Sequence, residues 1–281
     1  MNALLQPAPY TTGEVEANGL TLRYLDYGGA GKPQLLCVHG GAAHAHWYDF
    51  VAADYVADFH VRSIDLRGHG DSDWKKPASY LYRDYAADLD AAVRAMGWQD
   101  FVLMGHSMGG MVSLLYAALF PGRLARLIIV DTLFDLPPER VARLRGVGEK
   151  PGTTYASCDE LVARYRLRPG ISVAPPEVVR HIALHSGRAV EEGGWRLKFD
   201  RAVYGTREAH DGLPYWSDVK VPSLLVRGGE SERISDAMYA EVKTRCPRAE
   251  LATVAGAHHH VMLDQPAAFN AAVKDFLRGT A

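Results

Sequence analysis

The first half of the chain alternates between two hydrophobic patterns. Short apolar runs bounded by turn residues are typical of strands buried inside a parallel sheet. Between them lie stretches whose apolar residues recur at helical spacing. This alternation predicts an α/β fold: a mostly parallel, doubly wound sheet with helices on its faces. The buried strands are expected at 33–38, 61–65, 101–104 and 127–130, and the helices around 47–58, at 80–96 and from 108 to 120.

The pattern changes after residue 132. Residues 134–215 contain helical stretches, proline pairs and many arginines, but no run that reads as a buried strand. We therefore expect a helical cap at 134–215, inserted into a core domain made of residues 1–133 and 216–281. In the core, strands return at 222–227 and 250–254 and a closing helix is expected at 266–278. Alternating runs at 14–17 and 20–27, joined by Asn18-Gly19, predict an N-terminal hairpin.

Composition narrows the class of protein. The 281 residues are 48% apolar and 23% charged, which is ordinary for a globular chain, and a formal charge of −2 favours neither nucleic acid nor an anionic membrane as partner. Cys37, Cys158 and Cys246 are too far apart for a disulfide framework or a zinc cluster. The N-terminus, Met1 to Pro7, has neither a basic region nor a long apolar run, so we expect no signal peptide and a cytoplasmic protein.

One stretch carries a candidate nucleophile. Gly105-His106-Ser107-Met108-Gly109 is a G-x-S-x-G that joins the strand predicted at 101–104 to the helix predicted from 108. A serine on such a sharp turn exposes its Oγ, and the glycines allow strand and helix to pass closely. The start of the helix offers free N–H groups to a developing negative charge. A glycine-rich turn with a solvent-exposed serine is the alternative interpretation.

An activated serine requires a base, a carboxylate to orient the base, and donors for the oxyanion. One of the three histidines 258–260, between the last strand and the closing helix, is the expected base. Glu230 and Glu232, after the strand at 222–227, compete with Asp131 for the carboxylate. The backbone N–H groups of Gly41 and Met108 are the expected oxyanion donors.

Taken together, these motifs resemble the α/β-hydrolase fold superfamily. His39-Gly40-Gly41, the loop from Asp65 to Ser72, the serine motif, the carboxylate after a strand and the segment from Ala257 to Phe269 occur in the family's order. The resemblance covers nearly the whole chain. It implies that the inserted segment is the cap that commonly covers the pocket.

The resemblance also implies site residues. Counting back from Asp264 and Pro266 places the family histidine at His259, although His258 stands where the family has glycine. The family acid falls at Glu232. A serine nucleophile after His106 is similar to that of esterases, lactonases and cofactor-free perhydrolases, whereas carbon–carbon bond hydrolases often carry asparagine at that position.

The sequence therefore predicts a serine hydrolase of small carboxylic esters, thioesters or lactones that works through an acyl-enzyme. Ser107, His259 and Glu232 would form the triad, with no cofactor and no metal. The partner is a small-molecule ester or lactone, and neither nucleic acid nor membrane is expected. Carbon–carbon bond hydrolysis and perhydrolysis are alternatives within the fold, and the sequence does not indicate an oligomeric state.

Two hypotheses come from other classes. His44-Ala-His46, followed by Asp49, suggests a metallohydrolase, although the aspartate is one residue away from H-x-H-x-D spacing. The other hypothesis is a small-molecule receptor on a hydrolase scaffold.

Two charged features are expected to be structural. Arg67 would pair with Asp65 and Asp71 and hold the glycine-rich loop that they share, and the three arginines of the cap at 164, 166 and 168 would form a solvated face.

Overall fold

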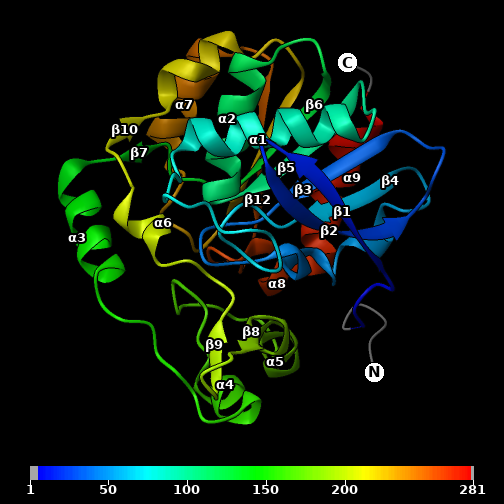
Figure 1. Ribbon diagram of the computed structural model, residues 1–281. Helices are drawn as coiled ribbons and strands as arrows, with labels where there is room; N and C mark the ends of the chain where they lie inside the picture. Colours follow the sequence, from blue (N-terminus) through cyan, green and yellow to red (C-terminus); the bar gives the residue numbers. More distant parts are fainter. Residues whose placement is uncertain (1–5, 280–281) are drawn as a thin grey trace.

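A mixed sheet of eight strands forms the centre of the molecule, in the order β1-β2-β4-β3-β5-β6-β11-β12. The computed structural model describes residues 6–279 (Figure 1). The N-terminal hairpin β1–β2 is antiparallel and joins β4 antiparallel, while the pairs from β4 to β12 are parallel. The predicted fold class is confirmed. The strands are β1 Thr11–Ala17, β2 Leu20–Gly28, β3 Gln34–Val38, β4 His60–Ile64, β5 Phe101–His106, β6 Leu124–Val130, β11 Ser223–Gly228 and β12 Ala249–Val254.

Each face of the sheet has its own hydrophobic core. Successive side chains of β3 alternate between them: Leu36 and Val38 belong to one core, and Leu35 and Cys37 to the other. The first core includes helices α1 (Tyr82–Ala95), α2 (Met108–Leu119) and α7 (Asp236–Arg245). The second includes α8 (Val261–Asp264) and α9 (Pro266–Arg278). Because both faces are covered, the inner strands are apolar throughout, which is why their sequences show no alternation.

The helix expected around 47–58 is wrong. This stretch forms two 3-10 turns, η2 (Ala45–Tyr48) and η3 (Ala52–Asp54). Its aromatic side chains are buried at the sheet, where the Tyr48 hydroxyl donates to the Val38 carbonyl at 3.0 Å and the Tyr55 hydroxyl to Asn270 Oδ1 at 2.6 Å. These long-range contacts fix the backbone, so the apolar run reflects core packing and not an amphipathic helix.

The segment predicted as the cap lies outside the sheet, to its left and below it in Figure 1. Short antiparallel pairs join its helices, and the β7–β10 pair closes its base through Leu136 and His210. The sequence pattern missed these strands because two or three residues are too few to show alternation. The elements are β7 Asp135–Leu136, α3 Pro138–Gly148, α4 Cys158–Arg164, α5 Pro176–His185, β8 Gly187–Ala189, β9 Trp195–Leu197, α6 Ala202–Gly205 and β10 His210–Asp211, and the 3-10 turn η4 (Leu213–Asp218) leads back to the core.

Within residues 6–279, no helix combines the length and the apolar character that a bilayer-spanning segment needs. The expectation of no signal peptide rests on Met1 to Pro7, most of which lie outside the described residues.

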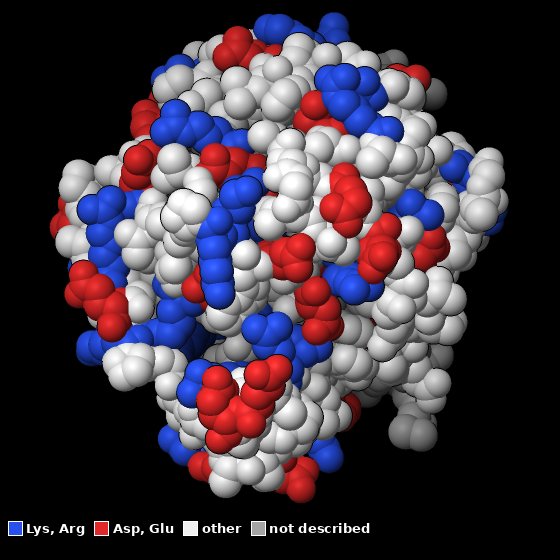
Figure 2. All heavy atoms as spheres, viewed as in Figure 1, with Lys and Arg blue, Asp and Glu red and all other residues white. Residues whose placement is uncertain are grey.

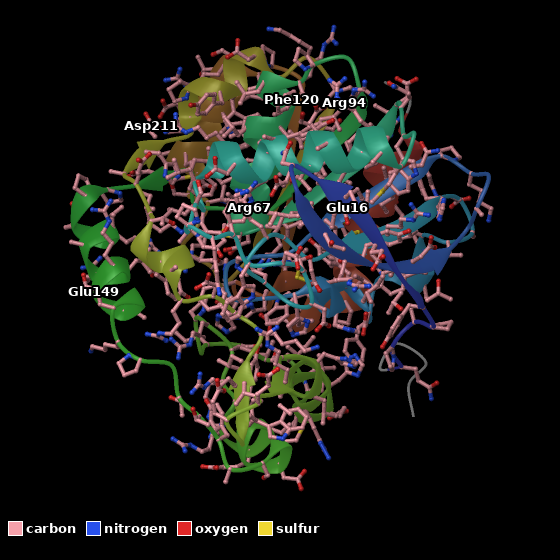
Figure 3. The ribbon with its side chains drawn as sticks, viewed as in Figure 1. Glu16, Arg67, Arg94, Phe120, Glu149 and Asp211 are labelled. Carbon is pink, nitrogen blue, oxygen red and sulfur yellow. The ribbon has the colours of Figure 1, made fainter. Side chains whose placement is uncertain are left out.

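Arg67 has a different partner from the one expected. Its guanidinium forms a two-point ion pair with Asp88 on α1, while Asp65 accepts backbone N–H groups from Ala45 and Asp71. Arg67 and Asp88 are 5% and 1% exposed, so the pair is buried. Figure 3 shows Arg67 in the interior, below α1. The long arginine stem reaches the helix, whereas on its own loop the Asp65 carboxylate is held by backbone donors and the Asp71 carboxylate by Lys198.

We expect Arg67→Met to destabilise the fold by about 3–5 kcal/mol, because it leaves the Asp88 carboxylate buried without its counter-charge. The matched control is Arg245→Met, which removes a solvent-accessible pair with Glu241 on α7 and should cost about 0.5 kcal/mol or less. Urea unfolding followed by circular dichroism measures both free energies. Equal losses in the two variants would contradict a stabilising role for the buried pair.

Candidate active site

Ser107 occupies a strained turn between β5 and α2. Its φ of 54° and ψ of −119° lie in a region that residues other than glycine rarely adopt. The conformation is held by the Ser107 N–H, which donates to the Val130 carbonyl of the neighbouring strand at 2.9 Å. The first residue of α2 follows directly, so the Oγ stands at the N-terminal end of the helix.

The glycines of the motif are required by close backbone contacts. A Cβ on Gly109 would collide with the carbonyl oxygens of Val38 and His39, and one on Gly105 with the carbonyl of Gly109. A Cβ on Gly110 would meet the hydroxyl of Thr132. The turn therefore brings β3, β5 and α2 closer together than any side chain at these positions would permit.

Ser107, His259 and Asp131 form a continuous hydrogen-bonded chain. The Ser107 Oγ lies 3.0 Å from His259 Nε2, and His259 Nδ1 lies 2.8 Å from Asp131 Oδ2. An ionised carboxylate only accepts, so Nδ1 carries the proton and Nε2 is free to accept from the serine hydroxyl. Asp131 is fully buried and His259 is 6% exposed, which shields the bond between them from water.

The assignment of the acid to Glu232 is wrong: the structure places Asp131, not Glu232, against the imidazole. Glu232 is exposed, and its side chain has no bond to His259. The loop after β11 instead supports Asp131, because the Ser231 hydroxyl donates to Asp131 Oδ2 at 2.6 Å and the Gly228 N–H to Oδ1 at 3.3 Å. Since β6 and β11 are neighbours, both strand ends approach His259, and only side-chain direction separates the two candidates.

The other nearby histidines hold the loop of His259. His106 Nε2 donates to the His259 carbonyl at 2.9 Å, and His260 Nε2 donates to the Pro169 carbonyl at 2.9 Å. The backbone N–H of His258 donates to Asp264 Oδ2 at 2.8 Å. Of the histidines 258–260, only His259 directs a ring nitrogen at the serine. The supporting roles of His106 and Ser231 were missed in the sequence, which offers no local signal for either.

Gly41 and Met108 both border the space in front of Ser107. A Cβ on Gly41 would lie 3.8 Å from the Met108 Cβ, so the two backbones are adjacent. Among the described residues, neither N–H donates to a backbone acceptor in a turn or loop. Both are therefore available to an anionic oxygen.

Burial and charge act on the pKa values of the pair. Burial, followed by the positive potential of His260, Arg233 and Arg140, holds the pKa of His259 well below its ordinary value. The Asp131 carboxylate acts in the opposite sense. Burial also raises the pKa of Asp131, although hydrogen bonds such as that from Ser231 oppose the rise.

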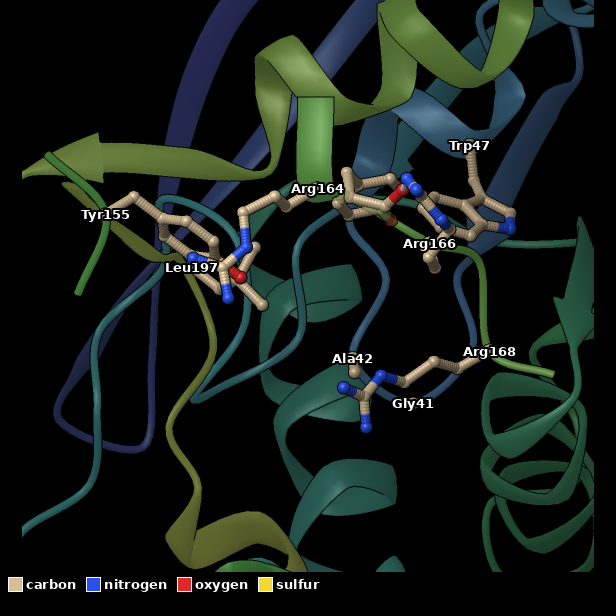
Figure 4. A pocket seen from close by; sticks show the side chains of 9 residues that line it. Gly41, Ala42, Trp47, Tyr155, Arg164, Arg166, Arg168 and Leu197 are labelled. Carbon is tan, nitrogen blue, oxygen red and sulfur yellow. Dashed lines mark hydrogen bonds between the residues drawn. The ribbon is translucent and has the colours of Figure 1, made fainter. Parts of the chain in front are cut away.

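A cavity of about 300 Å³ opens over Ser107 and His259, walled by the cap and by the loop that follows β11. A smaller cavity of about 130 Å³ adjoins it, and the two share Gly41 and Arg168. Figure 4 shows the smaller cavity, in which Trp47 and Tyr155 stand on opposite sides and the Arg168 guanidinium reaches toward the Gly41–Ala42 turn. In Figure 2, basic side chains border the hollow between core and cap.

This fold and site define a hydrolase scaffold, and comparison with known proteins agrees. The model of the alpha/beta hydrolase fold family matches residues 33–266, so the chain belongs to that family. The chain is 30% identical to N-formylmaleamate deformylase of Pseudomonas putida over 280 residues, covering 94% of this chain and 96% of the relative. It is 27% identical to an esterase of Mycobacterium tuberculosis over 264 residues, covering 89% and 84%.

Among solved structures, the chain is similar to E-2-(acetamidomethylene)succinate hydrolase. The two superpose with a TM-score of 0.84 at 25% identity, over 96% of this chain and 100% of the other.

Asp131→Asn is expected to lower kcat by a factor on the order of 10⁴, because the amide no longer fixes the working tautomer of His259 or stabilises its cation. Glu232→Gln should leave kcat within about twofold of the unmodified protein, since its side chain points to solvent. The two kcat values are compared once circular dichroism shows that both variants are folded. An active Asp131→Asn beside an inactive Glu232→Gln would return the acid to Glu232.

Proposed function

We propose that the protein is a serine hydrolase of small acyl compounds that works through an acyl-enzyme. The observation that supports it is the hydrogen-bonded chain Ser107–His259–Asp131, opening into a cavity beside two free backbone donors. This revises the acid of the triad and keeps Ser107, His259, Gly41 and Met108 in the roles expected of them.

The geometry suggests the following steps. As Ser107 Oγ bonds to the acyl carbon, its proton moves to His259 Nε2 and the carbonyl electron pair moves onto oxygen, which the Gly41 and Met108 N–H groups stabilise. The imidazolium then gives its proton to the departing alcohol, thiol or amine as the bond to the acyl carbon breaks. Water repeats the sequence on the acyl-enzyme, with Ser107 Oγ as the leaving group.

The names of the relatives bear on the acyl group. Ester cleavage is the activity in the name of one relative, while a deformylase and an acetamidomethylene compound point to N-acyl bonds. The same triad serves both, because the leaving atom only needs a proton from His259. Small esters, thioesters and lactones remain the proposed substrates, and N-acyl compounds are added to them. Carbon–carbon bond hydrolysis and perhydrolysis stay as alternatives for the same serine.

A fluorophosphonate should label Ser107 stoichiometrically, because Ser107 alone among the serines has a hydroxyl bonded to a histidine that a carboxylate orients. The adduct is mapped by mass spectrometry, and Ser107→Ala should lose both labelling and ester turnover. Ser113→Ala is the matched control, since its hydroxyl donates to a carbonyl within α2. Full activity in Ser107→Ala, or labelling elsewhere, would refute the proposal.

A further inference from the structure

The cavity over Ser107 carries an excess of positive charge. Arg140, Arg168, Arg207 and Arg233 line it, and no aspartate or glutamate is among its lining residues. They come from α3, from the segment after α4, from the end of α6 and from the loop after β11, so cap and core both contribute. Arg168, one of the cap arginines expected on a solvated face, is exposed as expected but also borders the cavity.

These guanidinium groups lack the partners that arginines usually have. In the described part of the chain, no ion pair involves the side chain of Arg140, Arg168 or Arg233. Arg140 and Arg233 are also close enough to repel each other. Burial, and then this repulsion, lowers the pKa of Arg233. By contrast, Arg164, which lines the smaller adjoining cavity, pairs with Glu160 at 2.8 Å. Charges held together without a counter-charge are costly unless a ligand supplies one.

Arg207 gives the second, independent observation. It is 5% exposed, yet its Nε has no hydrogen-bond partner among residues 6–279. Its Nη2 contacts the Met108 Sδ, a weak acceptor, and the guanidinium lies 5.0 Å from the centre of the Tyr82 ring. A buried guanidinium held in this way beside the residue that follows the nucleophile is available to a carboxylate, which it can bind through two parallel bonds.

We infer that the substrate of this site is an acyl compound bearing a carboxylate, which the arginine cluster binds while Ser107 attacks the acyl carbon. This inference rests on the proposed function. A cavity of about 300 Å³ suits a short-chain diacid derivative better than a long lipid.

A matched pair of esters tests this inference. Mono-4-nitrophenyl adipate and 4-nitrophenyl hexanoate differ only in a terminal carboxylate in place of a methyl group. We expect the adipate ester to have a higher kcat/KM by about 10–100-fold, through a lower KM, because each charge-assisted bond contributes about 1.5–3 kcal/mol. Arg233→Gln and Arg140→Gln should remove most of this preference, because they lower kcat/KM for the adipate ester far more than for the hexanoate ester. Arg143→Gln is the control, because it makes the same charge change on the exposed side of α3.

The pH dependence of activity distinguishes an electrostatic role of the arginines from a structural one, because a residue that only supports the fold would not shift it. Neutral His259 is the working form, so activity falls as the pH drops through its pKa. Because burial, followed by the positive potential of His260, Arg233 and Arg140, depresses that pKa, the acid limb of kcat/KM should lie below 6.5, the ordinary value for a histidine. A bound carboxylate offsets the positive charge of the arginines. With the adipate ester, the acid limb of the kcat profile should therefore lie at a higher pH than the acid limb of kcat/KM. Arg233→Gln should shift the acid limb of kcat/KM to higher pH. Asp131, His106 and His260 also face the ring and remain in every variant.

Binding separates failure of this inference from failure of the proposed function. Calorimetry on Ser107→Ala should show adipate binding that weakens about 10-fold or more in the added Arg233→Gln background. Adipate binding without turnover of any ester would refute the hydrolase and keep the carboxylate site. Equal turnover of both esters without adipate binding would refute the carboxylate site and keep the hydrolase. Inorganic phosphate that binds more tightly than adipate would also overturn the carboxylate assignment.

A second cluster, away from the catalytic cavity, carries an independent inference. His46, Asp49, His181 and His185 each direct a possible ligand atom to one place, with all four atoms within 4.8 Å of one another. His46 Nδ1 and His181 Nε2 lie 2.8 and 2.7 Å from Asp49 Oδ2, and the rings of His46 and His185 stack with centroids 3.6 Å apart. None of the four lines the cavity over Ser107.

The chemistry of this cluster fits a divalent metal. His181 and His185 are four residues apart on α5, which places both on one face of the helix, and His46 with Asp49 comes from the core. Three imidazoles and a carboxylate are a zinc ligand set, whose atoms lie about 2.0–2.2 Å from the ion and about 3.4 Å from one another. The Tyr27 hydroxyl donates to Asp49 Oδ1 at 2.7 Å, the kind of outer bond that orients a ligating carboxylate.

We propose that these four side chains form a zinc-type site that fastens α5 of the cap to the core. His44, which the H-x-H pattern suggested as a ligand, is not part of it: its Nε2 contacts Ser186 Oγ and the Ile182 carbonyl at the end of α5. This proposal replaces the expectation of no metal with a structural metal site, and it does not support the metallohydrolase hypothesis.

The protein, stripped with a chelator and titrated with Co²⁺, should bind one equivalent and develop the intense visible bands of a tetrahedral site; excess Zn²⁺ should raise Tm by about 5 °C. His185→Gln and His181→Gln should abolish both effects, while His258→Gln should retain them. Loss of ester turnover on stripping would make the metal catalytic and overturn the structural assignment. Equal binding by His185→Gln and His258→Gln, or no cobalt spectrum in the unmodified protein, would leave only a hydrogen-bonded cluster and refute the site.

Discussion

The structure depends on the close approach of three backbones around Ser107. Without a side chain at positions 105, 109 and 110, β5 and α2 pack directly against β3 and the residues after β6. That approach forces Ser107 into its strained conformation. It places the Oγ near Gly41, which follows β3, and within reach of His259, which Asp131 at the end of β6 orients. A single methyl group on any of these glycines would separate the nucleophile from its donors or from its acid.

Charge is distributed unevenly around this turn. Asp131 lies behind His259 as the buried negative group, and its bonds to Ser231 and Gly228 support it. The four arginines lie in front, around the cavity. The imidazole thus stands between a carboxylate that favours its cation and guanidinium groups that oppose it, and the charge of the bound molecule decides the balance. A site of this kind couples the affinity for an anion to the basicity of its catalytic histidine.

Polar groups hold the cap to the core at several places, and two of these are close to groups described above. Pro169 accepts from His260 beside the catalytic loop, and α5 meets η2 through the histidine–aspartate cluster and through His44. Such contacts need correct geometry to repay the loss of water, so they fix the position of the cap more narrowly than apolar packing would. Since Arg140, Arg168 and Arg207 belong to the cap, that position also sets the shape of the cationic wall.

The sequence by itself determined what local spacing controls. Strand and helix periods predicted the sheet, and glycine spacing predicted the turn at Ser107. The resemblance to the family, counted back from Asp264 and Pro266, selected His259 over its neighbours. The structure alone decided what depends on residues far apart in the chain. Asp131 and His259 are separated by 128 positions, so a choice between acids on adjacent strand ends needed side-chain directions. Tertiary structure also decided which arginines line the cavity and which residue pairs with Arg67. The same is true of the packing of α5 against η2: the His181–His185 spacing was visible in the sequence, but the core residues that it meets were not. Local sequence sets backbone conformation, whereas charge compensation is settled only by packing.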